Sequence, residues 1–179
     1  LKSVGYRASW EKINELVRLF QQAHLIGLLP EYSTSLAPKT TTTDKVYAVD
    51  QGMAYATSRA NQQDIGKRLE TAIYAELMRR TANGRLETVT SFTAPTQARE
   101  KVDFLVGDAL ASEPYALYQV TVDMTAEKTR RREVGSLEVA MVKTGIKDAN
   151  IITLREATQI KTEHGVIEVI PAWKWSLGL

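Results

Sequence analysis

Two apolar runs in the middle of the sequence each contain one polar side chain that could do chemistry. Asp103 lies in the first run, residues 99–106, and Gln119 lies in the second, residues 115–124. Runs of this length, rich in β-branched residues, are typical of buried strands. A carboxylate inside an apolar strand is costly unless it is paired, hydrogen-bonded or bound to a metal. Asp103 is therefore the first residue for which we expect a specific partner.

If the two strands form a hairpin, one register accounts for both polar side chains. That register places Asp103 beside Gln119 and Leu105 beside Leu117. The connecting loop then runs from about Gly107 to Tyr115, which is longer than the commonest hairpin turns.

Gln119 and Thr121 share one face of the second strand, because side chains in a strand alternate with a period of two. An aspartate followed by such a polar pair is the outline of a site in which acidic groups hold a divalent cation and a lysine stabilises charge at a phosphate. Gln119 keeps a carbonyl oxygen but carries no charge, and Thr121 offers no cation. The alternative is two core strands in which Asp103 and Gln119 simply find hydrogen-bond partners.

The totals exclude several classes of site. The 179 residues are enough for one core, or one core with a small appendage. The net charge of +2, from 23 basic and 21 acidic residues, does not by itself imply a nucleic-acid partner. Without cysteine there can be no disulfide, thiolate zinc site or cysteine nucleophile, and a cytoplasmic location fits. We expect no membrane span.

The N-terminal segment has the outline of half a winged helix. Residues 9–23 carry helical apolar spacing with Ser9 as the cap, and the short apolar runs 25–29 and 45–49 flank a polar, Thr-rich stretch that would be the wing. The alternative is a helical extension packed on the main core. We expect residues 1–49 to form a winged-helix-like part and residues 50–179 the main domain.

A helix is predicted from Ile65 to about Thr81, with Asp64 as its cap. Two carboxylates, Glu70 and Glu76, lie on or beside its apolar side, and Glu76 can also pair with Arg80 one turn later. The expected apolar stripe contains Ile65, Leu69, Ala72, Ile73 and Leu77.

The remaining pattern predicts a strand at 86–94, a helix at about 126–144 and strands at 150–154, 159–162 and 166–171. Thr125 or Asp123 would cap that helix, and Trp173 and Trp175 would pack across the sheet. The fold class is therefore α/β, a mixed central sheet flanked by helices. The first turns of the helix carry Lys128, Arg130, Arg131 and Arg132, which suggests a nearby anion such as phosphate or, alternatively, a solvated face with pairs such as Glu127 to Arg131.

Several short motifs, in this order, resemble a domain of unknown function that follows the P-loop ATPase part of AAA-like prokaryotic proteins. The resemblance covers nearly the whole chain and implies a PD-(D/E)XK restriction-endonuclease-like fold. The motifs are residues 45–52, 66–70 with 76–77, 101–104, 118–120, 129–133 and 170–175.

The resemblance implies that Glu70 is the helix acid and Asp103 the strand acid of a nuclease-type site. Gln119 then stands where the nuclease pattern has Glu, and Thr121 where it has Lys. Glu70, Asp103 and Gln119 would be the ligands of Mg²⁺. Lys101, Arg131 or Arg132 could supply the missing cation, and Arg130 would join Arg131 and Arg132 in binding phosphate.

No phosphate loop for ATP is visible in this chain. Nucleotide binding would belong to an attached N-terminal ATPase domain, which agrees with a chain that starts at Leu1 without Met. We therefore expect a nuclease-like module that has lost catalysis and binds DNA or a protein partner. The alternatives are an active Mg²⁺-dependent DNA endonuclease and a structural or oligomerisation domain.

Overall fold

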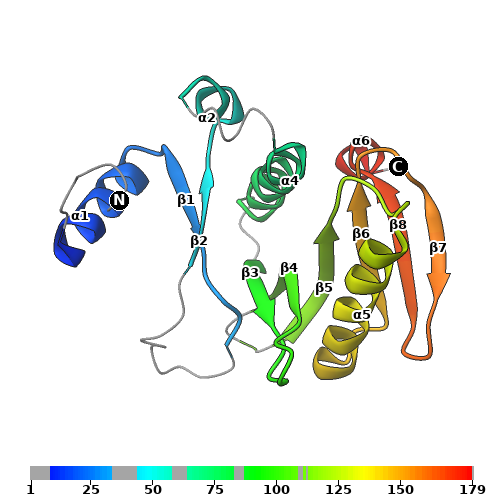
Figure 1. Cartoon of the computed structure of the whole chain (residues 1–179). Coiled ribbons are helices and arrows are strands. Elements are labelled where there is room, and N and C mark those ends of the chain that lie inside the picture. Colours follow the sequence, from blue (N-terminus) through cyan, green and yellow to red (C-terminus); the bar gives the residue numbers. More distant parts are fainter. Residues whose placement is uncertain are drawn as a thin grey trace.

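A computed structural model describes residues 9–33, 44–57, 64–82, 87–108, 111 and 113–178. The order of its helices and strands along the chain can be followed in Figure 1. In order they are α1 (Trp10–Gln22), β1 (Ile26–Leu29), β2 (Lys45–Ala48), α2 (Gln51–Thr57), α4 (Ile65–Thr81), β3 (Glu87–Thr93), β4 (Lys101–Asp108), β5 (Glu113–Val120), α5 (Glu127–Thr144), β6 (Asp148–Thr153), β7 (Thr158–Lys161), β8 (Val166–Pro171) and α6 (Ala172–Leu177).

The strands form one mixed sheet of six and one antiparallel pair. The large sheet has the order β3-β4-β5-β6-β8-β7, and β1 pairs with β2. Strands β3, β4 and β5 are antiparallel, β5, β6 and β8 are parallel, and β7 returns antiparallel to β8. The parallel step from β5 to β6 is made through α5. The predicted α/β class with a mixed sheet flanked by helices is confirmed.

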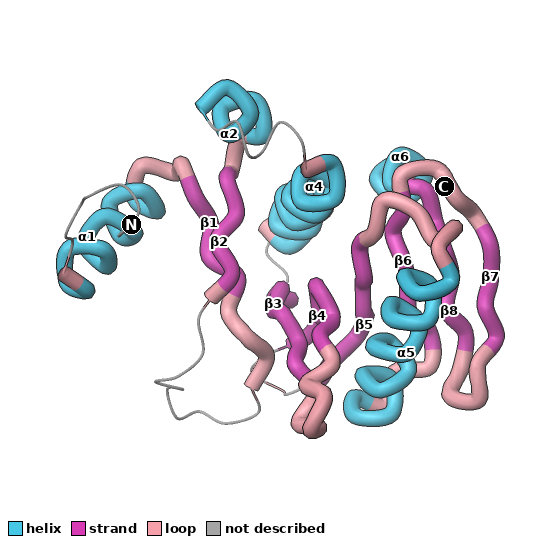
Figure 2. Tube along the Cα trace, in the orientation of Figure 1, coloured by secondary structure: helices cyan, strands magenta, loops and turns pink. Residues whose placement is uncertain are grey.

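Two hydrophobic cores lie on the two faces of the large sheet. On one face, α5 packs through Leu137, Ala140 and Met141 onto residues such as Leu117 and Ile151. On the other face lie α4, α6 and the small β1-β2 sheet. Figures 1 and 2 show α4 between the small sheet and β5. Helix α4 therefore joins the two sheets.

The β4-β5 hairpin has the predicted register, with Leu105 opposite Leu117. The predicted long loop from Gly107 to Tyr115 is wrong, because pairing continues to Asp108 opposite Glu113 beyond a bulge in the ladder. At that bulge a Cβ on Gly107 would lie 2.4 Å from the backbone oxygen of Glu113. The absent side chain lets the two strands approach closely enough to keep pairing.

A second bulge lies in β4 at Asp103 and Phe104. Thr90 of β3 pairs with Leu105 of β4, and Phe92 pairs with Val102. One residue of β3 therefore lies opposite two residues of β4. The extra residue of β4 disrupts the alternation of side chains between the faces. Bulges of this kind re-aim a side chain, and the side chain concerned here is the predicted acid.

The N-terminal segment forms the predicted helix, strand and returning strand. Ser9 caps α1 by accepting from Lys12 N, and β1 pairs antiparallel with β2 from Ile26 opposite Ala48 to Leu29 opposite Lys45. The predicted Thr-rich wing falls largely on residues 34–43, outside the described residues. The winged-helix assignment and the boundary between residues 49 and 50 stay predictions.

The small sheet is attached to the large one in two ways. Leu29 and Tyr47 are buried in the same core as Ile73 and Phe104. Beyond β1, the backbone of Ser91 in β3 donates to Pro30 O (2.8 Å) and accepts from Tyr32 N (2.7 Å). These contacts fix the end of β1, and with it the start of β2, against the edge of the large sheet.

Helix α4 begins and ends where predicted, and Asp64 accepts from Lys67 N as its cap. The predicted stripe is wrong at Ile65 and Ala72, which are exposed. Thr71 and Tyr74 are buried instead. The reason is that α4 packs against β2 as well as the large sheet, so its buried side is displaced from the stripe expected for one sheet.

The predicted cap of α5 is also wrong. The helix begins at Glu127 after Ala126, without a side-chain cap. The carboxylate of Asp123 instead accepts from Thr125 N at 3.1 Å, which forms a local turn before the helix. Gly145 ends α5 in the left-handed conformation, which glycine adopts readily because it has no side chain.

The C-terminal tryptophans differ from each other. Trp175 in α6 is buried and packs edge-on against Tyr118, whereas Trp173 is exposed. Only Trp175 confirms the predicted packing on the sheet, because the two side chains leave a helix rather than a strand.

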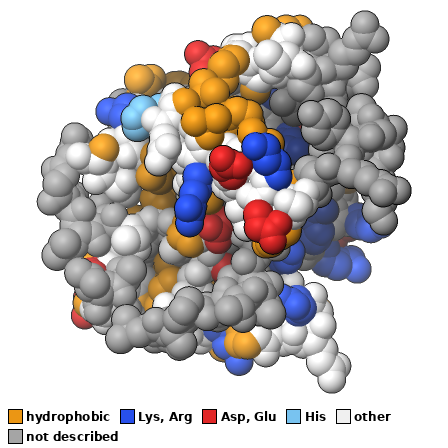
Figure 3. Space-filling view, turned by 90° about the vertical axis from the view of Figure 1, so that its left-hand side faces the viewer, with side chains coloured by type: hydrophobic (Ala, Val, Ile, Leu, Met, Phe, Trp, Pro, Cys, Tyr) orange, Lys and Arg blue, Asp and Glu red, His pale blue; other side chains and the backbone are white. Residues whose placement is uncertain are grey.

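Helix α1 has no buried residue, and its larger apolar side chains are partly or largely exposed. Figure 3, viewed from the side of α1 and the small sheet, shows apolar, acidic and basic side chains intermixed. None of the described helices is both long enough and apolar enough to cross a membrane.

Candidate functional site

A cavity of about 500 Å³ collects most of the residues predicted to do chemistry. It lies where β2, α4, β4, β5 and α5 meet. Its charged and amide-bearing lining residues are Lys45, Glu70, Glu100, Lys101, Asp103, Gln119, Arg132 and Glu133.

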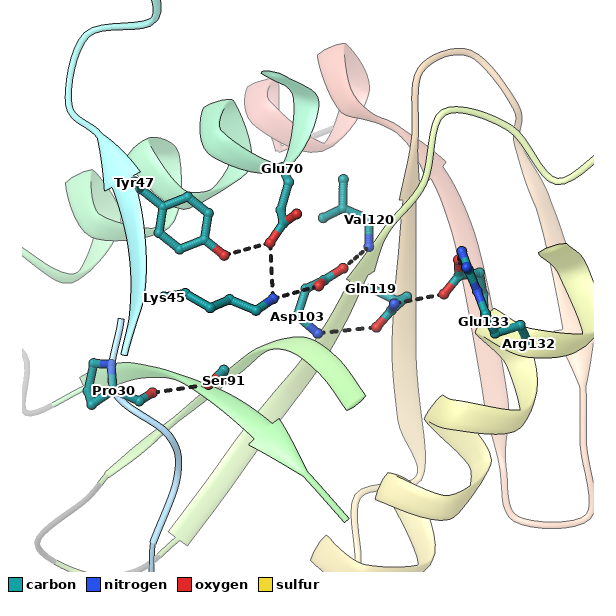
Figure 4. Close-up of polar contacts among 10 residues, drawn as sticks. All are labelled: Pro30, Lys45, Tyr47, Glu70, Ser91, Asp103, Gln119, Val120, Arg132 and Glu133. Atoms are coloured by element: carbon teal, nitrogen blue, oxygen red, sulfur yellow. Dashed lines mark hydrogen bonds and ion pairs between the residues drawn. The ribbon is translucent and has the colours of Figure 1, made fainter. Parts of the chain in front are cut away.

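The ammonium group of Lys45 bridges the two predicted acids. Lys45 Nζ lies 3.0 Å from Glu70 Oε1 and 2.9 Å from Asp103 Oδ1. Figure 4 shows the three side chains converging from β2, α4 and β4. Each side chain is partly buried, so the ion pairs are screened less than pairs on the surface.

The surroundings of Lys45 keep it protonated. Burial alone would lower the pKa of its ammonium group, but the charges and hydrogen bonds of Asp103 and Glu70 outweigh burial and raise the pKa above its usual value of 10.5. Lys45 is therefore a fixed cation at neutral pH and not a base or nucleophile.

Tyr47, which lies in β2 with Lys45, holds Glu70 through a hydrogen bond. Its hydroxyl donates to Glu70 Oε1 at 2.6 Å, and its ring stacks on Tyr74 of α4 with 4.3 Å between centroids. Lys45 and Tyr47 share a face of β2 because they are two residues apart. Burial, followed by the charge of Glu70, raises the pKa of Tyr47, which keeps it a hydrogen-bond donor.

Asp103 lies at the centre of the cavity, at the bulge of β4. Its Oδ1 accepts from Lys45, and its Oδ2 accepts from Val120 N at 3.0 Å. Burial, together with the charge of Glu70, raises the pKa of Asp103, while Lys45 acts in the opposite direction. The direction of the shift shows that Lys45 does not fully compensate for taking this carboxylate out of water.

Gln119 connects Asp103 to a buried acid that the sequence did not single out. Gln119 Oε1 accepts from the backbone N of Asp103 at 3.2 Å, and Gln119 Nε2 donates to Glu133 Oε2 at 2.7 Å. Glu133, on α5, is 2% exposed. Its other oxygen, Oε1, accepts from the guanidinium of Arg132, whose side chain is largely exposed.

Of the other predicted site residues, some line the cavity and others lie outside it. Lys101 is exposed and lines the cavity. Thr121 follows the end of β5 and donates to Asp123 O at 3.2 Å, outside the cavity lining. Arg131 pairs with Glu127 at 3.2 Å on the surface, the pairing expected of a solvated face. Neither Arg131 nor Arg130 lines the cavity.

The three predicted ligands of Mg²⁺ are arranged around hydrogen-bond donors. Glu70 Oε1 and both oxygens of Asp103 accept hydrogen bonds, as does Gln119 Oε1, and the ammonium of Lys45 lies between the two carboxylates. Among the residues that the structure describes, no group of three or more His, Cys, Asp or Glu side chains is placed to hold a metal ion. In this arrangement the ammonium of Lys45 lies between Glu70 and Asp103, and the assignment of Glu70, Asp103 and Gln119 as Mg²⁺ ligands stays a prediction.

Sequence signals for the missed residues existed but were weak. Lys45 precedes Tyr47 by two positions, so an inward Tyr47 would have placed Lys45 on the same side. Glu133 stands four residues before Leu137 and seven before Ala140, on the apolar side of α5. A carboxylate in that line needs a partner, which is Gln119.

The chain is similar to a distant relative among known proteins. The chain is 30% identical over 183 residues to the uncharacterized protein MJ1544 of Methanocaldococcus jannaschii, an alignment that covers 99% of this chain and 38% of the relative. The chain thus spans well under half the length of that protein. No family model matches the chain, and no solved structure matches it.

Proposed function

We propose that this chain is a nuclease-like module that binds DNA without cutting it and serves a larger protein that contains a P-loop ATPase domain. The position of Lys45 carries the proposal, because its ammonium lies 2.9 to 3.0 Å from both carboxylates of the acidic pair. A nuclease that uses two such acids places a divalent cation between them. Here a side-chain cation takes that position.

Two exposed cationic side chains at the mouth of the cavity favour an anionic ligand. Lys101 is exposed there, and the side chain of Arg132 is 71% exposed although its guanidinium pairs with Glu133. Exposed lysine and arginine side chains attract the phosphate backbone of nucleic acids in a salt-dependent manner. Four acids, Glu70, Glu100, Asp103 and Glu133, line the cavity, and Lys45 and Arg132 reduce the negative charge that they present to a phosphate.

The attached ATPase rests on the resemblance of the motifs. The M. jannaschii relative is long enough for a further domain, since this chain aligns with 38% of it. Under this proposal, the ATPase domain would bind and hydrolyse ATP, and this chain would bind DNA.

Calorimetric titration with Mg²⁺ and Mn²⁺, and a DNA-binding assay, test the proposal. Wild-type protein should bind neither metal in the low millimolar range and should leave plasmid and oligonucleotide DNA intact. It should bind a labelled oligonucleotide, with an affinity that falls as salt rises. Lys101→Met should weaken that binding. Lys12→Met on α1, far from the cavity lining, is the matched control.

The variant Lys45→Met tests whether Lys45 keeps metal ions away from Glu70 and Asp103. If Lys45 excludes metal, its removal leaves two carboxylates facing each other, and the variant should bind Mn²⁺ more tightly than wild type. Additional substitution Asp103→Ala should abolish the gain. Failure of wild-type protein to bind DNA would instead favour a structural or oligomerisation domain.

An active Mg²⁺-dependent endonuclease is the second candidate, and Lys45 also favours it. Thr121 cannot supply the ammonium group that the nuclease pattern needs, whereas Lys45 places one 2.9 Å from Asp103. Under this reading, wild-type protein cuts DNA in the presence of Mg²⁺, and both Lys45→Met and Asp103→Ala abolish cleavage. Cleavage by wild type that is lost in both variants would replace the first proposal by the second.

A further inference from the structure

A buried carboxylate on α5 determines how the Gln119 side chain is oriented. Glu133 is 2% exposed, and its Oε2 lies 2.7 Å from Gln119 Nε2. The opposite end of the same amide, Oε1, faces the backbone N–H of Asp103 at 3.2 Å. Figure 4 shows the amide between α5 on one side and β4 on the other.

The polarity of these two neighbours leaves one orientation of the amide. An ionised carboxylate only accepts hydrogen bonds, and a backbone N–H only donates. Turning the Gln119 amide over would set its oxygen against Glu133 and its NH₂ group against Asp103 N, so both contacts would become repulsive. In a site that is 8% exposed at Gln119, little water can compensate for that loss.

The same geometry explains why residue 119 is an amide where the nuclease pattern has an acid. A carboxylate at 119 would still accept from Asp103 N, but its second oxygen would lie about as close to the Glu133 carboxylate as Nε2 does now. Two buried carboxylates at such a distance cannot both be ionised without a cation between them. Glu133 therefore requires a hydrogen-bond donor at residue 119.

We propose that Glu133 is a positioning residue of the cavity, which acts through Gln119 to hold β4 at Asp103 and through an ion pair to hold Arg132 at the mouth. This inference rests on the proposed function only for the role of Arg132 toward DNA. The extra residue of β4 at Asp103 leaves that strand locally irregular. The Gln119 contact ties the backbone there to α5, while Val120 N ties its side chain to β5.

The test compares the single variants Glu133→Gln and Gln119→Glu with the double variant that carries both changes, all in the full chain. Urea unfolding reports stability, and the side-chain NH₂ signals of Gln119 in a ¹⁵N NMR spectrum report the hydrogen bond directly. Binding of a labelled oligonucleotide is measured on the same proteins. Glu138→Gln, also on α5 but outside the cavity lining, is the control.

Gln119→Glu should give the largest drop in the urea midpoint, and the double variant should recover most of it, because its donor and acceptor are exchanged rather than lost. In Glu133→Gln, the Gln119 NH₂ signals should move from their wild-type positions, whereas Glu138→Gln should leave them in place. A role in packing alone would predict neither the recovery nor the shift of the amide signals. If Gln119→Glu does not fold alone, the double variant and the amide signals still decide the question.

Glu133→Gln should weaken oligonucleotide binding severalfold, and the same loss should appear in Arg132→Met without a further loss when the two are combined. Additive losses would show that Glu133 does not act through Arg132. If wild-type protein binds no oligonucleotide, the proposed function fails. Urea unfolding of the single and double variants, together with the Gln119 amide signals, still tests the role of Glu133. Equal stability of Gln119→Glu and the double variant, with unmoved amide signals, would overturn that role.

Discussion

The two ends of the cavity place a cation beside buried or partly buried carboxylates in different ways. At one end, the single cation of Lys45 pairs with both Glu70 and Asp103, which lie 25 and 58 residues away in the chain. At the other end, Arg132 neutralises its immediate neighbour Glu133, and Gln119 is 14 residues from that acid. The first end depends on docking of the small sheet, whereas the second is built within the main sheet and α5. Perturbing the small sheet should therefore disturb one end and spare the other.

The largest effect is expected from Lys45→Met, which leaves two partly buried carboxylates without their cation. Breaking a buried ion pair costs about 3 to 5 kcal/mol, and the partial exposure of these groups reduces the expected loss to about 2 kcal/mol at pH 7. Urea unfolding measures the loss. Lys12→Met, which removes an exposed lysine, should change stability by less than about 0.5 kcal/mol.

The loss in Lys45→Met should also depend on pH. The pKa of Asp103 is raised in the folded protein above its ordinary value of 3.8, so folding favours the protonated carboxyl. Lys45 lowers the pKa of Asp103, so its removal should raise that pKa further, and the deficit of the variant should shrink as the pH falls from 7 toward the pKa of Asp103 in wild type. A deficit that grows on acidification would show that the carboxylates do not repel each other.

A smaller effect is expected from Tyr47→Phe, which keeps the stacked ring and removes the hydrogen bond to Glu70. Hydrogen bonds to charged groups contribute about 1.5 to 3 kcal/mol, and partial exposure of Glu70 places the expected loss near the lower value. The NMR signals of the Gln119 amide should not move. Movement of those signals would mean that the two ends of the cavity are coupled.

Glu76 provides a comparison within α4, because it lies outside the cavity and pairs with Arg79 and Arg80 at 2.7 and 2.8 Å. The hydrogen bond from Arg79, helped by that from Arg80, lowers the pKa of Glu76 to about 2. Its stabilisation should be complete above pH 4.5 and be lost as the pH falls from 4.5 to about 2. Glu76→Gln should cost about 1 kcal/mol at pH 7, measured by urea unfolding, and nothing near pH 2.

The smallest effect is expected from Arg131→Ala, since Arg131 and Glu127 form an exposed pair. Such pairs contribute about 0 to 1 kcal/mol, so the change in unfolding free energy should stay below about 0.5 kcal/mol. Arg132→Ala should cost more, because it leaves the buried Glu133 without its cation. Equal effects of the two substitutions would remove the distinction between the surface pair and the cavity pair.

Local signals in the sequence predicted the elements well. Capping by Ser9 and Asp64 involves a backbone N–H three residues away, and the Leu105–Leu117 register follows from the alternation of two adjacent strands. These features depend on neighbours in the chain. The apolar stripe of α4 was partly wrong because it depends on two sheets at once.

The candidate site was predicted less completely, for a physical reason. Glu70, Asp103 and Gln119 were assigned roles from the sequence, and the structure brings all three to one cavity. Lys45 was not foreseen, because nothing near it in sequence reports an acid 58 residues away. Glu133 follows three arginines and was overlooked within a segment interpreted as a basic surface. Its burial depends on how α5 is turned toward β5, which the charge pattern does not reveal.

The contact of residues 30–32 with β3 has a consequence for how the protein behaves among other copies of itself. Strands β3 and β7 form the two edges of the large sheet, and an edge strand offers unpaired backbone groups to any other chain. The bridge from Glu31 to Ser91 occupies part of the β3 edge with the protein's own backbone. Within the described chain, β7 is the less protected edge, and its short length of four residues, with lysine at its end, limits the template that it offers for aggregation.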